Sequence, residues 1–134
     1  MKVVARFVVL VVLVVGVFAG VAHADEEDFP SKAIRFVVPL PPGGITDVLA
    51  RLIAQKLTES WKQPVVVDNR GGGGTIIGSD IVSKAPPDGH TLLLVAPALV
   101  INPSLRRELP YDAEKSFAPV TLLVFSPAVL VVHP

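Results

Sequence analysis

The sequence predicts an α/β protein whose mostly parallel sheet is covered by helices on both faces. Short runs that are almost wholly apolar alternate with longer stretches in which apolar residues recur every three or four positions, as in amphipathic helices. Strands buried on both sides have such continuous apolar runs, and a helix between two strands lets them run parallel. We expect strand, helix, strand, helix and strand at residues 34–38, 46–61, 65–67, 76–82 and 91–95.

The first expected strand, turn and helix occupy residues 34–61. The strand is short and rich in β-branched residues, and a turn of prolines and glycines follows it at 39–44. The helix is expected to be capped by the hydroxyl of Thr46, while Asp47 in the first turn complements the helix dipole. Its buried stripe is expected to contain Val48, Leu49, Leu52, Ile53 and Leu57.

The pattern continues after Pro64, which ends this helix. A strand at 65–67 is followed by four glycines, a helix at 76–82, a Pro-Pro-Asp-Gly turn and a third strand at 91–95. Residues 97–109 are expected to hold one short helix, and the apolar runs at 120–125 and 129–133 are expected to be strands. Because a parallel strand at 129–133 would lack its crossover, the domain is expected to be incomplete at its C-terminus.

Residues 1–24 have the three parts of a secretory signal: basic residues at Lys2 and Arg6, an apolar run at 7–21, and small residues at Ala22 and Ala24. The apolar run is shorter than the roughly 20 residues that span a bilayer, so cleavage after Ala24 is favoured over a membrane anchor. Export of a chain without cysteine predicts a disulfide-free protein, which in a bacterium means the periplasm.

The charge of the remaining segment excludes one class of partner. Two of the 12 basic residues lie in the signal, so ten remain against 12 acidic residues, a net charge of −2 with neutral histidines. Nucleic-acid binding normally needs a basic surface, and we therefore expect no nucleic-acid partner.

The candidate site is the turn between the first strand and its helix. Prolines make this turn rigid, and glycines allow a ligand to approach the backbone closely. The free N–H groups at the start of the helix then point to a place for an anion. Gly43 and Gly44 favour ligand contact over the alternative that Thr46 and Asp47 only cap the helix. The glycines at 71–74 predict either a second strand-to-helix turn near the same ligand or a flexible loop.

Several familiar sites are absent from the sequence. The phosphate-loop spacing Gly-x-x-x-x-Gly-Lys-Ser/Thr does not occur, and no register of residues 71–78 completes the Gly-x-Gly-x-x-Gly fingerprint of dinucleotide sites. The three histidines are far apart, and no serine lies in a Gly-x-Ser-x-Gly elbow. We therefore expect no metal, no cofactor and no catalytic residue.

Six strings of residues, in order along the chain, carry a resemblance to a known family. They include Pro-Leu-Pro-Pro-Gly-Gly-Ile-Thr-Asp and Ala-Pro-Pro-Asp-Gly-His-Thr-Leu-Leu, and they lie at 39–47, 63–70, 84–93, 101–105, 109–112 and 117–120. Together they closely resemble the tripartite tricarboxylate transporter substrate-binding proteins, also called the Bug receptor family. The likeness covers essentially all of the chain after the signal.

The resemblance implies a monomeric periplasmic solute receptor with the type II binding-protein fold, in which two α/β lobes close on a small carboxylate. Its partners would be the membrane components of a tripartite transporter. Members of the family have roughly 300 residues in two lobes, so residues 25–134 would form part of the first lobe. The ligand contacts that it implies are Gly43, Gly44, Ile45, Thr46 and Asp47 in the first turn, Gly73 and Gly74 in the second, and Ala96 and Ala98 after the third strand.

Two other interpretations stay open from the residues alone. A secreted α/β enzyme would use Asp47 as a base and the glycine turns as an oxyanion site. Alternatively, the chain is a gene fragment that does not bind, because a partial lobe leaves apolar edges uncovered.

Overall fold

The computed structural model describes residues 29–125, 127 and 129–133. The predicted signal at 1–24 and the acidic residues 25–28 lie outside the described residues. The elements are β1 (Ile34–Val38), α2 (Ile45–Trp61), β2 (Val65–Asn69), α3 (Ile76–Ser83), β3 (Thr91–Leu93) and α4 (Ala98–Leu105). The predicted alternation of strands and helices is confirmed, as is the short helix expected within 97–109.

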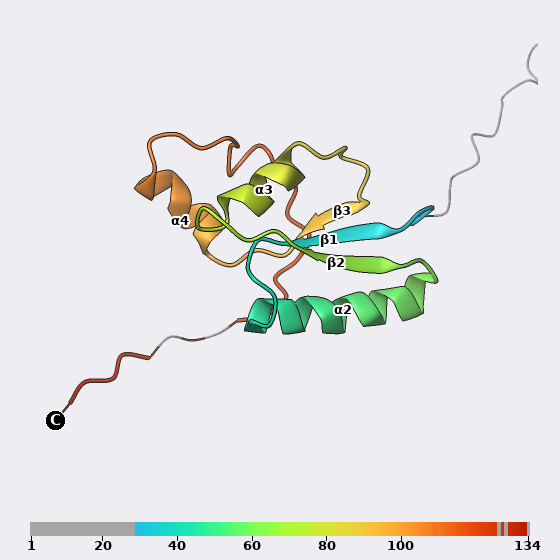
Figure 1. Ribbon diagram of the computed structural model, residues 1–134, viewed down its shortest axis with the longest axis horizontal. Coiled ribbons are helices and arrows are strands. Elements are labelled where there is room, and N and C mark those ends of the chain that lie inside the picture. Colours follow the sequence, from blue (N-terminus) through green and yellow to red (C-terminus); the bar gives the residue numbers. More distant parts are fainter. Residues whose placement is uncertain (1–28, 126, 128, 134) are drawn as a thin grey trace, which may run out of the picture.

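The three strands form a parallel sheet in the order β2-β1-β3, with Phe36 opposite Val67 on one side and Leu92 on the other. Helix α2 covers one face of the sheet and α3 the other (Figure 1). The central strand is therefore enclosed on all sides, and Ile34, Val37 and Val38 have no exposed surface. This arrangement confirms the predicted α/β class and explains the continuous apolar run of β1.

The buried face of α2 differs from the predicted stripe. The helix packs on Phe36 and Val38 through Ala50 and Ala54, whereas Val48 and Leu52 are 48% and 57% exposed. The prediction that these two larger residues face the core is therefore wrong. Small side chains at positions four apart let the helix lie close to the sheet, and this close approach turns the larger side chains toward the edges.

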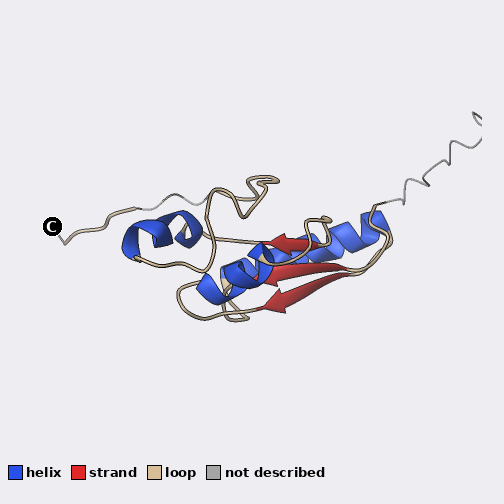
Figure 2. Cartoon of the chain, turned by 90° about the horizontal axis from the view of Figure 1, so that it is seen from above, coloured by secondary structure: helices blue, strands red, loops and turns tan. Residues whose placement is uncertain are grey.

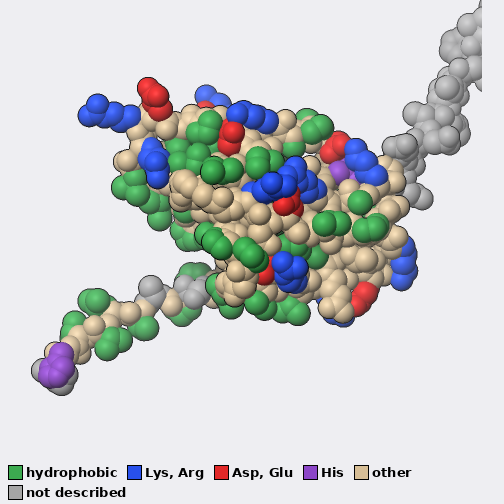
Figure 3. All heavy atoms as spheres, viewed as in Figure 1, with side chains coloured by type: hydrophobic (Ala, Val, Ile, Leu, Met, Phe, Trp, Pro, Cys, Tyr) green, Lys and Arg blue, Asp and Glu red, His purple; other side chains and the backbone are tan. Residues whose placement is uncertain are grey.

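The predicted strands at 120–125 and 129–133 are not formed in the described part of these segments. A strand needs a neighbour with which to exchange hydrogen bonds, and the ladders within the described residues join only β1, β2 and β3. Leu122, Phe125 and Leu130 are 81%, 84% and 92% exposed. Apolar side chains stand clear of the folded part along the described C-terminal tail (Figure 3). No helix in the described residues is long and apolar enough to cross a membrane.

Candidate functional site

Two glycine-containing turns lie side by side where the strands end. The first turn, residues 39–44, follows β1, and the second turn, residues 71–75, follows β2. A side chain at Gly71 would begin 3.2 Å from the backbone nitrogen of Pro41, and one at Gly78 would begin 2.6 Å from the Cβ of Pro39. Glycine at these positions lets the turns touch at the carboxyl edge of the sheet, where open α/β proteins bind ligands.

The start of α2 is arranged differently from the predicted cap. The helix begins at Ile45 with Gly44 as its N-cap, and no side chain caps it. The predicted capping role of Thr46 is therefore wrong, because Thr46 is already the second residue of the helix. Asp47 reaches back instead, and its Oδ2 accepts the backbone N–H of Gly43 at 2.9 Å. Its predicted position in the first turn is confirmed.

Four backbone donors remain at this helix start. Within the part of the chain that the structure describes, the N–H groups of residues 44–47 donate to no acceptor. Gly44 and Ile45 are exposed, and Ile45 is 77% exposed. Unpaired N–H groups and the positive end of the dipole together favour an anion at such a place.

Asp47 is a buried carboxylate in this turn, with 4% of its surface exposed. Hydrogen bonds from Arg51, whose Nε lies 3.1 Å from Oδ2, and from the N–H of Gly43 lower the pKa of Asp47 to about 2. A general base works best with a pKa near the working pH. The low pKa of Asp47 therefore argues against the enzyme interpretation, in which this carboxylate takes up a proton.

Helix α4 holds the second turn from outside. Asn102 is 6% exposed and donates from Nδ2 to the carbonyl oxygen of Gly74 at 3.0 Å, and Arg106 donates to that of Gly73 at 3.4 Å. Both views place α4 beyond the carboxyl ends of the strands (Figure 1 and Figure 2). Sequence reasoning missed Asn102 and Arg106. A polar Asn inside the apolar string Ala-Leu-Val-Ile-Asn was the signal that could have identified the first.

Backbone geometry explains the glycines of the second turn. Gly73 and Gly74 have φ values of 60° and 68°, and Thr75 has φ 79°. Such left-handed conformations are favourable for glycine and strained for threonine. The oxygens of Gly73 and Gly74 each accept a hydrogen bond from α4. A carboxylate only accepts hydrogen bonds, so its contacts with these two residues would be their N–H groups.

The loop after β3 begins beside the end of β1, since Leu94 N–H donates to the carbonyl of Val37 at 2.9 Å. Ala96 and Ala98 are half-buried there, on either side of Pro97, the N-cap of α4. Neither has a polar side chain, so any ligand contact from this loop comes from the main chain. The described residues contain no group of His, Cys, Asp and Glu that could hold a metal ion.

The fold is that of part of a periplasmic binding protein, since the structure superimposes on the solved periplasmic binding protein BugD. Residues 49–134 match the family described as the tripartite tricarboxylate transporter family receptor. The chain belongs to this family, which confirms the resemblance found in the sequence.

Curated relatives support the assignment. The chain is 52% identical over 104 residues to the "UPF0065 protein in tcbD-tcbE intergenic region" of Pseudomonas sp. strain P51, covering 78% of this chain and 31% of that protein. It is 42% identical over 127 residues to "Protein BugT" of Bordetella pertussis, covering 90% and 39%. The chain thus spans about a third of the length of the relatives that it matches.

Solved structures share the fold. The periplasmic binding protein BugD superimposes with a TM-score of 0.65 at 37% identity, over 68% of this chain and 30% of BugD. "R. palustris Rpa4515 with adipate" gives a TM-score of 0.62 at 40% identity, over 65% and 29%. MatC from Rhodopseudomonas palustris with bound malate gives 0.63 at 36% identity, over 71% and 33%.

Proposed function

We propose that this chain forms part of the first lobe of an exported receptor that binds a small carboxylate, delivers it to a tripartite tricarboxylate-type transporter and performs no chemistry. The observation that carries the proposal is the set of four unpaired backbone N–H groups at residues 44–47. Two similar proteins were solved with the dicarboxylates adipate and malate. The carboxylate oxygens of such ligands accept hydrogen bonds from N–H groups of this kind.

The ligand is held mainly by the backbone in this proposal. A carboxylate oxygen accepts two hydrogen bonds at the start of α2, where the helix dipole also favours negative charge. The second turn touches the first at Gly71, so it extends the same surface toward the rest of the ligand. The proposed contacts are Gly43, Gly44, Ile45, Thr46, Asp47, Gly73, Gly74, Ala96 and Ala98, and a second lobe would bury the opposite side of the ligand.

The place of action follows from the sequence and the family. Residues 1–24 are proposed to direct export and to be removed after Ala24. The receptor then works as a monomer in the periplasm. BugD, whose structure is similar, is described as a periplasmic binding protein.

A proline substitution tests the proposal, because it removes one backbone donor without changing the helix. Ile45 is the first residue of α2, where proline fits well, and Gly44 has the extended conformation, ψ 170°, that precedes proline favourably. Ile45→Pro deletes one charge-assisted hydrogen bond, a loss of about 1.5–3 kcal/mol and so of roughly 10- to 100-fold in affinity.

The measurement is a titration of the ¹⁵N-labelled chain with adipate and with malate, followed by the amide shifts of Gly44 and Thr46. Ile45→Ala is the matched control, since it removes the side chain but keeps the N–H group, and it should bind as the wild type does. Adipamide, which has the same skeleton without charge, should cause no shift. The proposal would be rejected if Ile45→Pro and Ile45→Ala had equal affinities, or if neither dicarboxylate shifted the amide signals of the wild-type chain.

A further inference from the structure

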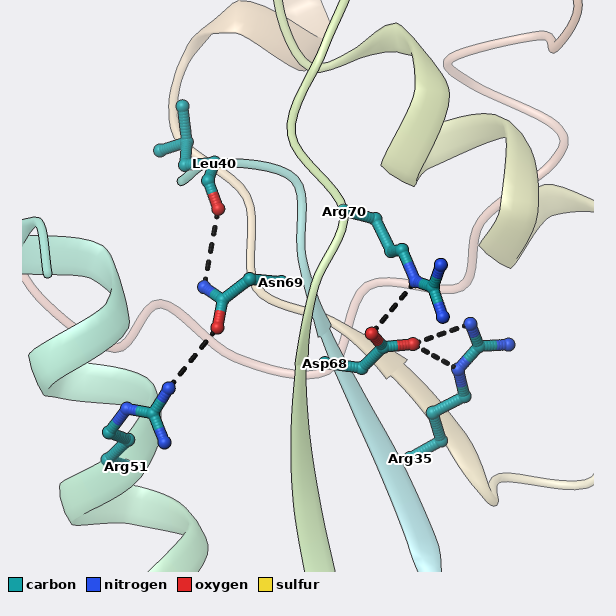
Figure 4. A network of polar contacts seen from close by, with 6 residues as sticks. All are labelled: Arg35, Leu40, Arg51, Asp68, Asn69 and Arg70. Carbon is teal, nitrogen blue, oxygen red and sulfur yellow. Dashed lines mark hydrogen bonds and ion pairs between the residues drawn. The ribbon is translucent and has the colours of Figure 1, made fainter. Parts of the chain in front are cut away.

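A series of hydrogen bonds joins α2, the end of β2 and the first turn, and the main chain from Leu40 to Gly43 closes it into a ring. Arg51 donates from Nε to Asp47 and from Nη2 to the Oδ1 of Asn69 at 3.3 Å. Asn69 in turn donates from Nδ2 to the carbonyl oxygen of Leu40 at 3.3 Å. Figure 4 shows Arg51 extending from the helix toward Asn69, and Asn69 pointing at Leu40. Because Asp47 holds the N–H of Gly43, the ring fastens both ends of the turn between Leu40 and Gly43.

This ring contains a charge that opposes the proposed ligand. The side chain of Asp47 is negative at neutral pH and lies in the same helical turn as the free N–H groups. The Asp47 side chain is 5% exposed, so water screens its charge less than that of an open surface group, and two like charges close together repel each other. A site for anions with an ionised carboxylate beside it therefore needs a compensating cation.

Arg51 is the cation in contact with Asp47. We propose that Arg51 is a positioning residue for ligand binding: it cancels the charge of Asp47 and keeps that carboxylate bound to Gly43, so that an anion can approach the free N–H groups of α2. The inference rests on the proposed function and adds a residue that touches the ligand only through another. A guanidinium suits this role because its fork reaches two acceptors, on Asp47 and Asn69, at the same time.

The neighbouring ion pairs do not share this role. In Figure 4, Asp68 is bound by Arg35 and Arg70, and these three residues have no contact with the first turn or with the start of α2 among the hydrogen bonds of the described residues. Lys56, on α2 itself, is paired with Glu59 at 2.8 Å. It lies 11 residues after Ile45, about 16 Å along the helix, which is beyond the Debye length of about 8 Å at physiological salt.

The test compares the adipate affinity of four forms of the chain by the same amide titration. Arg51→Gln leaves Asp47 without its cation and should weaken binding by about tenfold, which corresponds to one negative charge at about 6 Å and an effective dielectric constant of about 40. Arg51→Gln with Asp47→Asn removes both charges while the new amide oxygen still accepts from Gly43, and affinity should return to within about threefold of wild type. Lys56→Gln removes the same charge from α2 and should bind as wild type.

Two further readouts keep the inference independent of folding and of the ligand. Arg51→Lys keeps a cation near Asp47, so its affinity should stay within about threefold of wild type even if Arg51→Gln unfolds. In Arg51→Gln that stays folded, the pKa of Asp47, measured by NMR, should rise from about 2 toward its ordinary value, because the hydrogen bond from Arg51 is the largest cause that lowers it.

The outcomes separate the inference from the function on which it rests. If adipate does not shift the amide signals of the wild-type chain, the proposed function is rejected, and the inference with it. A wild type that binds, beside an Arg51→Gln variant that binds equally well, overturns the inference alone. Weak binding in Arg51→Gln that Asp47→Asn does not restore, or an Arg51→Lys variant as weak as Arg51→Gln, also overturns it, since charge compensation would then not be the reason.

Discussion

Gly78→Ala tests the close packing of α3 on Pro39, the first residue of the first turn. Gly78 is buried in α3, and a Cβ added there would lie 2.6 Å from the Cβ of Pro39 and 2.8 Å from the carbonyl oxygen of Arg70. Ordinary contacts begin near 3.4 Å, so α3 would have to retreat by about 0.8 Å. Neither neighbour is the end of a flexible side chain, because one is a proline ring and the other is backbone.

The expected loss of stability follows from two opposing effects. Overpacking a well-packed interior costs about 1–3 kcal/mol, and the upper value applies here because rigid atoms must move. Alanine is favoured over glycine inside a helix by about 1 kcal/mol. The free energy of unfolding should therefore fall by about 2 kcal/mol, which for a domain of this size lowers Tm by about 10 °C.

Urea denaturation followed by circular dichroism measures this change. Gly44→Ala is the matched control, since an added Cβ there meets nothing within 4 Å and φ is −79°. It should lose no more than about 1 kcal/mol, from the poorer N-cap. If Gly78→Ala unfolds within about 0.5 kcal/mol of wild type, α3 does not sit against Pro39, and this close packing of the helix on the first turn would have to be abandoned.

Three further predictions concern stability. Asn102→Ala leaves two acceptors of the second turn without their donor and should cost about 1–3 kcal/mol in urea; an unchanged midpoint would show that α4 does not hold that turn. Lys62→Gly should stabilise the chain by about 1 kcal/mol, because Lys62 ends α2 with φ 58°, and a lower midpoint would refute this. Folding lowers the pKa of Asp47 and of Asp88 from 3.8 to about 2. The stability they contribute is therefore complete above about pH 4 and is lost as pH falls toward 2. A urea midpoint that stays constant or rises as pH falls from 4 to 2 would contradict this prediction.

The order of strands and helices was predictable because it depends on local patterns. The apolar run of β1 and the glycines after β1 and β2 are visible without knowledge of the fold. The face of α2 was not predictable in the same way. Hydrophobicity ranks Val48 and Leu52 above Ala50 and Ala54 as core residues, but the distance between helix and sheet decides which size fits.

The strands expected at 120–125 and 129–133 show a second limit. An apolar composition is necessary for a buried strand, but a ladder also needs a partner at the right place, which is a property of the tertiary structure. The described residues of these segments have the composition and are exposed, as Leu130 is at 92%. The pattern therefore described their chemistry correctly and their conformation wrongly.

The candidate site was predictable as a place, and less so as a set of contacts. The sequence indicated the first turn and offered the second as its neighbour, and Gly71 and Gly78 supply the close approach. The cap at Thr46 failed because the helix begins one residue earlier, at Ile45, with Gly44 as its N-cap, and it is Asp47 that binds the N–H of Gly43. Asn102 was missed because its partners lie 27 and 28 residues away along the chain.

The division of the backbone N–H groups into bonded and free ones also shows which substitutions should change the affinity for a ligand. The carboxylate of Asp47 accepts the N–H of Gly43, and the N–H groups of the next four residues stay free. Thr46 and the alanines of the loop after β3 contribute no side-chain hydrogen bond among the described residues. Recognition that depends on main-chain N–H groups is insensitive to the side chains that carry them. It is sensitive to anything that removes a donor or adds a charge. This is why Ile45→Pro, rather than Thr46→Ala, tests the proposed receptor, and why Arg51→Gln tests the role of charge at its site.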